Sequence, residues 1–393
     1  MRFLHTSDWH VGRPLKTTKR DDEYAAALAE VLDIAKREKV DCLLVAGDIF
    51  DSVAPPPEAE RIVFDFLREL IGEQIPAVMI AGNHDNPRRL NAFARVLDLM
   101  NVHVRGEPSV DGGLIVEVPS RAGKETAIVA ALPWVPERKV QDFDKLWFGD
   151  EKFSQYAQGV SGAMKHLVKS FRTDTVNVLM SHVLLDDSKI ADIDRGERAL
   201  HTGIAYTVPR ALLPSDPQYI ALGHVHMPQN FELANAFYCG SLLQVDFGEA
   251  GQKKRVNIVD LSPGQLARVE HMPLKSIRQL LNIGSAKAGV ALEEVARLAA
   301  EAGDAYLKVF LKADRPVPGL AQQVREIAPN AVHVETVREA QDEASAIDFD
   351  MHRESPAEVF TGFYRREHSG NEPPADLMAL FNRLYEEVAD APR

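Results

Sequence analysis

The sequence predicts an α/β protein in which layered, mixed sheets are flanked by helices, followed by a small α/β module and C-terminal helices. Over the first 260 residues, short runs rich in Val, Ile and Leu alternate with helical patterns, which is typical of sheets covered on both faces. Beyond Pro263-Gly264 the pattern changes to helix, strand, helix, strand. A polar, acidic stretch and two short helical patterns follow, so we expect three domains: residues 1–270, 275–340 and 341–393.

The first domain is expected to contain nine strands and three helices. The strands are expected at residues 2–6, 42–46, 77–81, 114–118, 127–132, 177–180, 219–222, 236–239 and 256–259. The helices are expected at residues 22–39, 58–71 and 89–99. The second of these helices follows three prolines and ends at Gly72, which are typical start and stop signals.

The second and third domains are shorter. Helices are expected at residues 292–302 and 319–328, and strands at 306–311 and 331–337. Ser355-Pro356 followed by Glu358 is typical of a helix start. After Pro374, apolar residues recur at helical spacing, which predicts a last helix.

Composition and charge exclude several classes of protein. The chain has 393 residues, 45 Lys and Arg against 58 Asp and Glu, and a net charge of −13, which disfavours a protein that coats nucleic acid by charge alone. No apolar run approaches the roughly 18 residues of a membrane-spanning helix, and residues 1–10 do not resemble a signal peptide. The two cysteines, Cys42 and Cys239, cannot form a disulfide framework, so we expect a cytoplasmic protein.

Polar residues with metal-binding side chains follow five of the expected strands. The motifs are Asp8-Trp9-His10, Gly47-Asp48, Gly82-Asn83-His84-Asp85, Ser181-His182 and Gly223-His224-Val225-His226. Functional groups gather at the carboxyl ends of strands in open α/β sheets, so we expect these motifs to converge. Taken singly, the Asp-x-His and Gly-Asp motifs are typical of turns and His182 of a partly buried histidine. Gly-His-x-His is more specific, and Gly-Asn-His-Asp more specific still. The ordered set predicts two divalent metal ions roughly 3.5–4 Å apart, bridged by Asp48.

The chemistry of these ligands narrows the choice of metal ion. Aspartate, histidine and one asparagine amide, with no thiolate, suit Mn²⁺ or Fe²⁺, with Zn²⁺ as an alternative. We expect Mn²⁺. Trp9 lies within the first motif, where a structural role is favoured over stacking on a base.

The five motifs, in this order, resemble those of the calcineurin-like metallophosphoesterases. Within that superfamily the chain is most similar to the nuclease subunits of bacterial SbcCD complexes. Residues 5–12, 45–51, 219–226 and 238–241 carry the similarity. It covers nearly the whole chain, although beyond residue 265 it lies in the layout more than in motifs.

The resemblance implies roles for the residues of the site. One ion would be held by Asp8, His10, Asp48 and His226, and the other by Asp48, Asn83, His182 and His224. His84 would protonate the leaving oxygen or stabilise its charge. Asp51 would orient the catalytic histidine, the alternative being that it caps a turn or helix.

The resemblance also implies a reaction and a substrate. A water would attack phosphorus in line while two ions offset the charge of the phosphate oxygens. The substrates would be DNA duplex ends, single strands and hairpins, cut by 3′→5′ exonuclease and endonuclease activity in repair and recombination. Four basic residues near the motifs are candidates for phosphate contacts, the alternative being a solvated face: Arg13, Lys16, Arg88 and Arg89. Lys19 and Arg20 extend the first basic run.

Partners are implied in the same way. The chain has no Gly-x-x-x-x-Gly-Lys-Ser/Thr loop, so ATP dependence would come from an SbcC-type ATPase. Residues 275–340 would form a cap that binds DNA. Six large apolar side chains in the C-terminal helices would dock the ATPase, or alternatively pack on their own domain: Phe360, Phe363, Leu377, Leu380, Phe381 and Leu384. A homodimer within a heterotetramer is also implied.

Two competing functions are weighed against the nuclease. A phosphatase or nucleotide pyrophosphatase of the same superfamily would keep the metal site but would not need residues 275–393. A non-catalytic scaffold would not need the full ligand set or His84.

Overall fold

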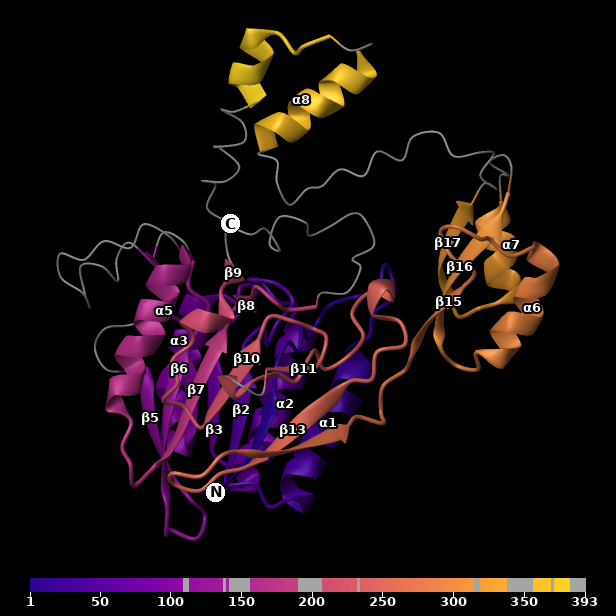
Figure 1. Cartoon of the computed structure of the whole chain (residues 1–393). Coiled ribbons are helices and arrows are strands. Elements are labelled where there is room, and N and C mark those ends of the chain that lie inside the picture. Colours follow the sequence, from indigo (N-terminus) through magenta and orange to yellow (C-terminus); the bar gives the residue numbers. More distant parts are fainter. Residues whose placement is uncertain are drawn as a thin grey trace. The chain divides into compact units, whose positions relative to one another are not determined.

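The structure is a computed structural model, and it describes residues 1–108, 113–136, 139–140, 156–189, 207–231, 234–313, 319–337, 356–368 and 371–381. The chain divides into two units, Met1–Glu339 and Ala340–Arg393. The first unit contains two six-stranded sheets, a three-stranded sheet and a short strand pair (Figure 1). The predicted three-domain division stays a prediction.

The first large sheet has the strand order β14-β13-β1-β2-β3-β4. Its strands β1 to β4 are parallel, and β13 runs antiparallel to both β1 and β14. The strands are β1 (Arg2–Thr6), β2 (Cys42–Ala46), β3 (Ala77–Ile80), β4 (Val102–Arg105), β13 (Arg255–Asp260) and β14 (Arg268–Pro273). The accompanying helices are α1 (Asp21–Arg37), α2 (Pro57–Gly72), α3 (Pro87–Leu97) and η1 (Asp98–Met100).

The second large sheet has the order β11-β12-β10-β7-β6-β5, with antiparallel pairing at both edges. Its strands are β5 (Ile115–Pro119), β6 (Thr126–Leu132), β7 (Val176–His182), β10 (Tyr219–Gly223), β11 (Gln229–Phe231) and β12 (Ala236–Tyr238). The pair β8 (Leu184–Leu185) and β9 (Thr207–Val208) lies beyond β7 in the chain. The associated helices are α5 (Tyr156–Leu167), η2 (Val168–Ser170), η4 (Arg210–Leu212) and η6 (Phe247–Glu249).

Alternating side chains on the strands build a four-layer core. In β2, Leu43 and Val45 pack against α1 and α2, whereas Cys42 and Leu44 pack against the second sheet. The outer face of the second sheet is covered by α5, which buries Met164 (Figure 1). Because both faces of the central strands are buried, strands such as β2 and β10 read as continuous apolar runs. The predicted α/β class with mixed sheets flanked by helices is confirmed.

The small α/β module has a core of its own. It consists of β15 (Leu280–Ile283), α6 (Leu292–Glu301), β16 (Tyr306–Lys312), α7 (Leu320–Ile327) and β17 (Ala331–Val337). Its three strands are parallel, and two helix residues, Val295 and Val324, are fully buried against them. Leu280 and Tyr306 of the module pack with Leu15 and Phe247, which belong to the large α/β part.

Several short strands were not predicted from the sequence. They are β4, β8, β9, β11, β14 and β15. β14 has no fully buried residue, and β4 alternates buried with half-buried residues, so neither presents an apolar run. The third helix begins at Pro87 and ends at Leu97, earlier at both ends than predicted.

The second unit pairs α8 (Pro356–Glu367) with a helical segment at residues 375–381. The rings of Phe360 and Phe381 stack with centroids 4.3 Å apart, so these two predicted docking residues pack within their own unit. Phe363 and Leu380 are exposed, and Leu377 is half-buried. Leu384 and the predicted linker at residues 340–354 lie outside the described residues. In the described part of the chain, no helix has the length and apolar character needed to cross a membrane.

Candidate metal centre

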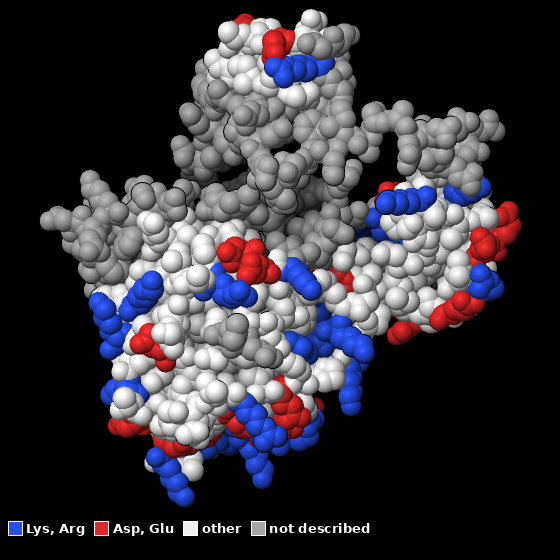
Figure 2. Space-filling model, viewed as in Figure 1, with Lys and Arg blue, Asp and Glu red and all other residues white. Residues whose placement is uncertain are grey.

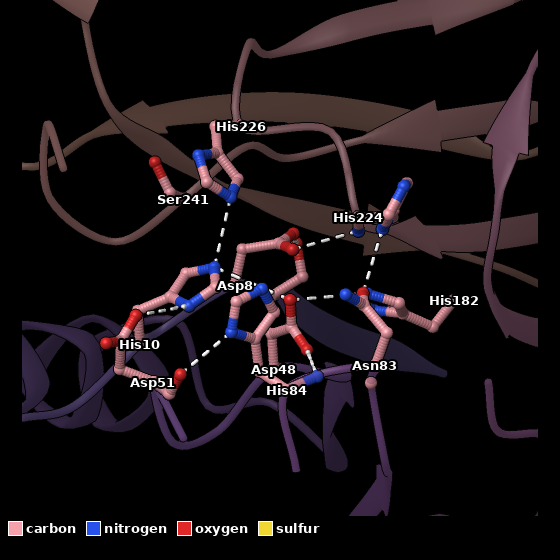
Figure 3. Close-up of polar contacts among 12 residues, drawn as sticks. Asp8, His10, Asp48, Asp51, Asn83, His84, His182, His224, His226 and Ser241 are labelled. Carbon is pink, nitrogen blue, oxygen red and sulfur yellow. Dashed lines mark hydrogen bonds and ion pairs between the residues drawn. The ribbon is translucent and has the colours of Figure 1, made fainter. Parts of the chain in front are cut away.

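The five predicted motifs meet at the carboxyl ends of β1, β2, β3, β7 and β10 (Figure 3). Backbone hydrogen bonds join the loops that follow β1 and β2. The amide of Asp8 donates to the carbonyl oxygen of Gly47 at 2.9 Å, and the amide of His10 donates to that of Asp48 at 2.9 Å. The two loops therefore run side by side and present their side chains to the same space.

The backbone at the centre adopts conformations that most residues avoid. Asp8, His10, Asp48 and His224 have φ values of 50°, 49°, 52° and 95°. Such left-handed conformations in non-glycine residues are costly, and they cluster at functional sites. The loops also approach closely, since a Cβ atom at Gly223 would lie 1.8 Å from the carbonyl oxygen of Ala46.

Asp8, His10 and His226 form the first group of potential ligands. Nε2 of His10 lies 3.0 Å from Nε2 of His226. Two atoms about 2.1 Å from one ion and about 90° apart at it lie about 3.0 Å from each other, so this spacing fits ligands of one ion. Oδ1 of Asp8 accepts a hydrogen bond from the amide of His224, which fixes the carboxylate.

Asn83 brings together the second group. Its Oδ1 lies 3.1 Å from Nε2 of His182 and 3.0 Å from Nδ1 of His224. Oδ2 of Asp48 lies between the two groups, 3.5 Å from Nε2 of His10 and 3.4 Å from Nε2 of His182. All seven predicted ligands therefore surround one region, and Asp48 faces both halves of it.

Contacts at the far side of two imidazole rings fix their tautomers. Nδ1 of His182 lies 2.8 Å from the carbonyl oxygen of Ala46, and Nδ1 of His226 lies 2.7 Å from Oε1 of Glu249. Carbonyl and carboxylate oxygens accept hydrogen bonds, so Nδ1 carries the proton in both rings. The Nε2 atoms then point toward the centre, the arrangement that metal-binding histidines use. The residues present fit divalent cations.

Burial and charge shift the pKa values of these groups strongly. Burial lowers the pKa of His10 to about 3, so its ring is neutral. Burial also opposes a charge on His182, but the Asp48 carboxylate raises the pKa of this histidine to about 9. Burial would raise the pKa of Asp48, yet His182 and His84 hold that pKa well below its usual range. Without a cation, a charged Asp48–His182 pair therefore occupies the centre.

His84 lies beside this ligand set. Its ring packs edge-on against His10 with centroids 4.8 Å apart, and it is only half-buried. Its Nδ1 lies 2.7 Å from the backbone carbonyl oxygen of Asp51, and its ring lies within reach of His10 and Asp48. The amide of His84 donates to Oδ1 of Asp48 at 2.9 Å. The ring can therefore reach a group bound at the centre.

The expected role of Asp51 in orienting the catalytic histidine stays a prediction, and the structure shows where its carboxylate lies. Its Oδ1 lies 3.4 Å from Nδ1 of His10 and 3.2 Å from a guanidinium nitrogen of Arg13. It does not cap α2, whose N-cap residue is Pro56. The backbone carbonyl of Asp51 contacts His84. The amino-acid sequence does not reveal this contact, because every residue has a carbonyl.

The four predicted DNA-binding residues fall into two classes. Arg13 pairs with Asp51, and Arg89 pairs with Glu60. Lys16 and Arg88 are exposed. Among the described residues on the face seen in Figure 2, basic groups are interspersed with acidic ones.

Arg20, which extends the first basic run, is not available for a phosphate contact. It is buried, with 3% of its surface exposed, and donates to Glu23 and to the carbonyl oxygen of Gln244.

Three further residues shape the centre and were not singled out from the sequence. Asp85 lies in the predicted Gly-Asn-His-Asp motif but was given no role of its own. It accepts hydrogen bonds from the amides of Ile49, Phe50 and Gly82. The ring of Trp134 stacks on His224 with centroids 5.4 Å apart and an interplanar angle of 24°. Glu249 is the third, through its contact with Nδ1 of His226. The position of Trp134 just after β6 is a weak sequence signal of a residue at the site. No local sequence pattern indicates that Glu249 belongs to it.

Comparison with known proteins gives consistent matches. Residues 1–228 match the family described as calcineurin-like phosphoesterase, and residues 265–368 match the type 5 capsule protein repressor C-terminal domain. The chain is 35% identical over 398 residues to the D subunit of the nuclease SbcCD of Bacillus subtilis (strain 168), with 99% of each chain covered. It is 32% identical to the corresponding SbcCD nuclease chain of Rhodobacter capsulatus, over 81% of this chain and 82% of the relative. The solved structure of TT1561 from Thermus thermophilus gives a TM-score of 0.39 at 14% identity, over 69% of this chain and 98% of that chain.

Proposed function

The chain belongs to the calcineurin-like phosphoesterases and, within them, to the family of SbcD nuclease subunits, and from this premise we propose how it cleaves DNA. It is the metal-dependent nuclease subunit of an SbcCD-type complex and hydrolyses phosphodiester bonds. The observation that carries the proposal is the position of Asp48 Oδ2, 3.5 Å from Nε2 of His10 and 3.4 Å from Nε2 of His182. One carboxylate thus faces both groups of potential ligands.

We assign the ligand groups to two cation sites. Asp8, His10, Asp48 and His226 would hold one divalent ion, and Asp48, Asn83, His182 and His224 the other. When bound, the two ions supply the positive charge that activates a water and offsets the charge of the phosphate oxygens. Mn²⁺ is the proposed metal because the donor set mixes oxygen and imidazole nitrogen without thiolate.

His84 acts on the phosphate group through Nε2. Because the backbone carbonyl of Asp51 holds Nδ1, Nε2 faces the space beside His10 and Asp48. A histidine in this position protonates the leaving oxygen or stabilises its charge, which typically contributes 10²–10⁴-fold to rate. Lys16 and Arg88, exposed near the motifs, are the proposed phosphate contacts that guide the DNA backbone.

The remaining assignments concern partners and location. We propose duplex ends and hairpins as substrates, 3′→5′ polarity for the exonuclease, and an SbcC-type ATPase as the partner within a heterotetramer built on a homodimer. The exposure of Phe363 and Leu380, 50% and 40% of their surface, supports docking of the ATPase on the second unit. Cys42 and Cys239 are buried free thiols, which supports a cytoplasmic location.

A digestion assay tests the proposal. The full chain, with Mn²⁺ and with or without the ATPase partner and ATP, is incubated with linear and hairpin DNA labelled at the 5′ or the 3′ end. We expect Mn²⁺-dependent cleavage in which the 3′ label is released first. Asp48→Asn, which neutralises the shared carboxylate, is the inactive control. Rapid turnover of small phosphomonoesters with no cleavage of either DNA would instead establish the phosphatase alternative.

A further inference from the structure

The short helix η6 lies between a proposed metal ligand and the small α/β module. Phe247 and Glu249, two of its three residues, are 2% and 3% exposed. Phe247 packs with Leu280 and Tyr306 of the module. Glu249, on the same turn, lies 2.7 Å from His226. A single turn of backbone therefore contacts both the module and the metal centre.

The Glu249 carboxylate uses both oxygens. Oε1 contacts Nδ1 of His226, and Oε2 accepts from Nζ of Lys254 at 2.7 Å. Lys254 also donates to the carbonyl oxygen of His226 at 2.9 Å and to Gln252 at 3.0 Å. The buried pair thus holds His226 by its ring and by its main chain. A buried polar network in which every group is paired makes its surroundings rigid.

Gln244 connects η6 to the first strand of the module. This fully buried side chain accepts from the amide of Leu280 at 2.6 Å and donates to the carbonyl oxygen of Glu249 at 3.1 Å. Arg20 holds the backbone of Gln244 by donating to its carbonyl oxygen. The module is therefore linked to Glu249 by a hydrogen-bond relay as well as by apolar packing.

We propose that Glu249 is a positioning residue for His226, and that η6 makes the affinity of this metal site depend on how the small module is seated. The inference rests on the proposed function, because it takes His226 as a metal ligand. When the module shifts, Phe247 loses its packing partners and Gln244 loses the amide of Leu280. Glu249 then no longer holds the ring of His226 with Nε2 toward the centre.

The first test measures Mn²⁺ binding to the full chain by equilibrium dialysis, with the bound metal counted. Glu249→Gln alone would leave Lys254 as an unpaired buried charge, so the main variant combines Glu249→Gln with Lys254→Met. Replacing both partners of a buried pair usually preserves stability. We expect roughly 10- to 100-fold weaker binding at one site and no change at the other. Asp260→Asn, which removes a carboxylate paired with Arg2 at the opposite strand ends, is the matched control.

The second test leaves Glu249 intact and disturbs the contact with the module. Phe247→Ala should weaken the same Mn²⁺ site by about fivefold or more, the size of a modest coupling between sites. Val324→Ala removes apolar volume from the module's own core, away from η6, and should leave the site unchanged. Unchanged Mn²⁺ affinity in folded Phe247→Ala would overturn the coupling.

The outcomes separate this inference from the proposed function. If the wild-type chain binds two Mn²⁺ ions and cleaves DNA while the Glu249→Gln/Lys254→Met variant, with a wild-type melting temperature, binds them equally well, the positioning role is wrong and the nuclease assignment stands. If the wild-type chain binds no Mn²⁺, the proposed function itself fails.

Discussion

Nδ1 of His84 lies 2.7 Å from the backbone carbonyl oxygen of Asp51. The carboxylate of the same aspartate instead faces His10 and Arg13, at 3.4 Å and 3.2 Å. One residue therefore contacts two histidines by different groups: its carbonyl oxygen contacts His84, and its carboxylate approaches the ring of a proposed metal ligand. Mutation can separate these two contacts, because a substitution at Asp51 removes the carboxylate and keeps the carbonyl.

His84→Ala and Asp51→Asn should therefore differ in kind. His84→Ala should lower kcat on linear DNA by 10²–10⁴-fold at saturating Mn²⁺ and leave metal content nearly unchanged, because it removes an acid but no ligand. Asp51→Asn keeps the carbonyl that orients His84. It should weaken Mn²⁺ binding roughly tenfold or more and largely recover its activity at high Mn²⁺. Single-turnover cleavage and metal counting distinguish the two, and a loss of kcat in metal-saturated Asp51→Asn would show that the carboxylate acts through His84.

Much of the metal centre is predictable from the sequence, because functional groups gather at the carboxyl ends of strands. The five motifs are local, and within each sheet parallel strands bring their ends to one edge. Asp8 follows β1 of the first sheet and His226 follows β10 of the second, so they meet, 218 positions apart, because the two sheets pack face to face. Contacts that depend on the tertiary fold leave no such pattern. Glu249 approaches His226 only through the position of η6 in the fold. In the sequence, Arg20 is one member of a basic run, and only the structure shows that it donates to the carbonyl oxygen of Gln244. The Asp51 backbone contact is hidden for the same reason, since every residue has a carbonyl.

Metal binding should release a proton from His182. Its pKa is raised to about 9 by Asp48 against the effect of burial, so the ring is charged below that pH. A metal ligand must be neutral, so binding at pH 7.5 displaces this proton, and Mn²⁺ affinity should rise as the pH increases from 6.5 toward about 9. His10, with its pKa lowered to about 3, is already neutral and contributes no proton. Calorimetry in buffers of different ionisation enthalpy measures the release. Binding that releases no proton and does not change over this pH range would contradict the charged pair.

Arg88 and Arg89 are adjacent in sequence but should respond differently to alanine substitution. Arg88 is exposed, so Arg88→Ala should weaken binding of all DNA sequences equally and reduce the slope of log affinity against log salt concentration by about 1. Arg89 pairs with Glu60, so Arg89→Ala should change stability by about 1 kcal/mol or less and leave the salt slope unaltered. Fluorescence anisotropy on a labelled duplex, in a His84→Ala background that does not cleave it, provides the comparison. Equal slopes for the wild-type chain and Arg88→Ala would exclude the phosphate contact.

Asp85 should be the residue whose loss most damages the loops of the centre. Its buried carboxylate accepts from the amides of Ile49, Phe50 and Gly82, and therefore ties the loop after β2 to the loop after β3. Asp85→Ala leaves three buried amides unpaired, so the free energy of unfolding in EDTA should fall by about 3 kcal/mol or more.

A neighbouring substitution supplies the control for Asp85. Asn86 accepts from the amide of Arg89 at the start of α3, and Asn86→Ala should cost only about 1 kcal/mol, as for an ordinary helix cap. The loops whose amides would lose their hydrogen-bond acceptor carry Asp48 and Asn83. Asp85→Ala should therefore also bind Mn²⁺ more weakly, whereas Asn86→Ala should bind Mn²⁺ like the wild-type chain. Urea titration in EDTA and equilibrium dialysis measure the two effects. If both variants unfold at the same urea concentration and bind Mn²⁺ equally, the three amide contacts do not hold the loops in place.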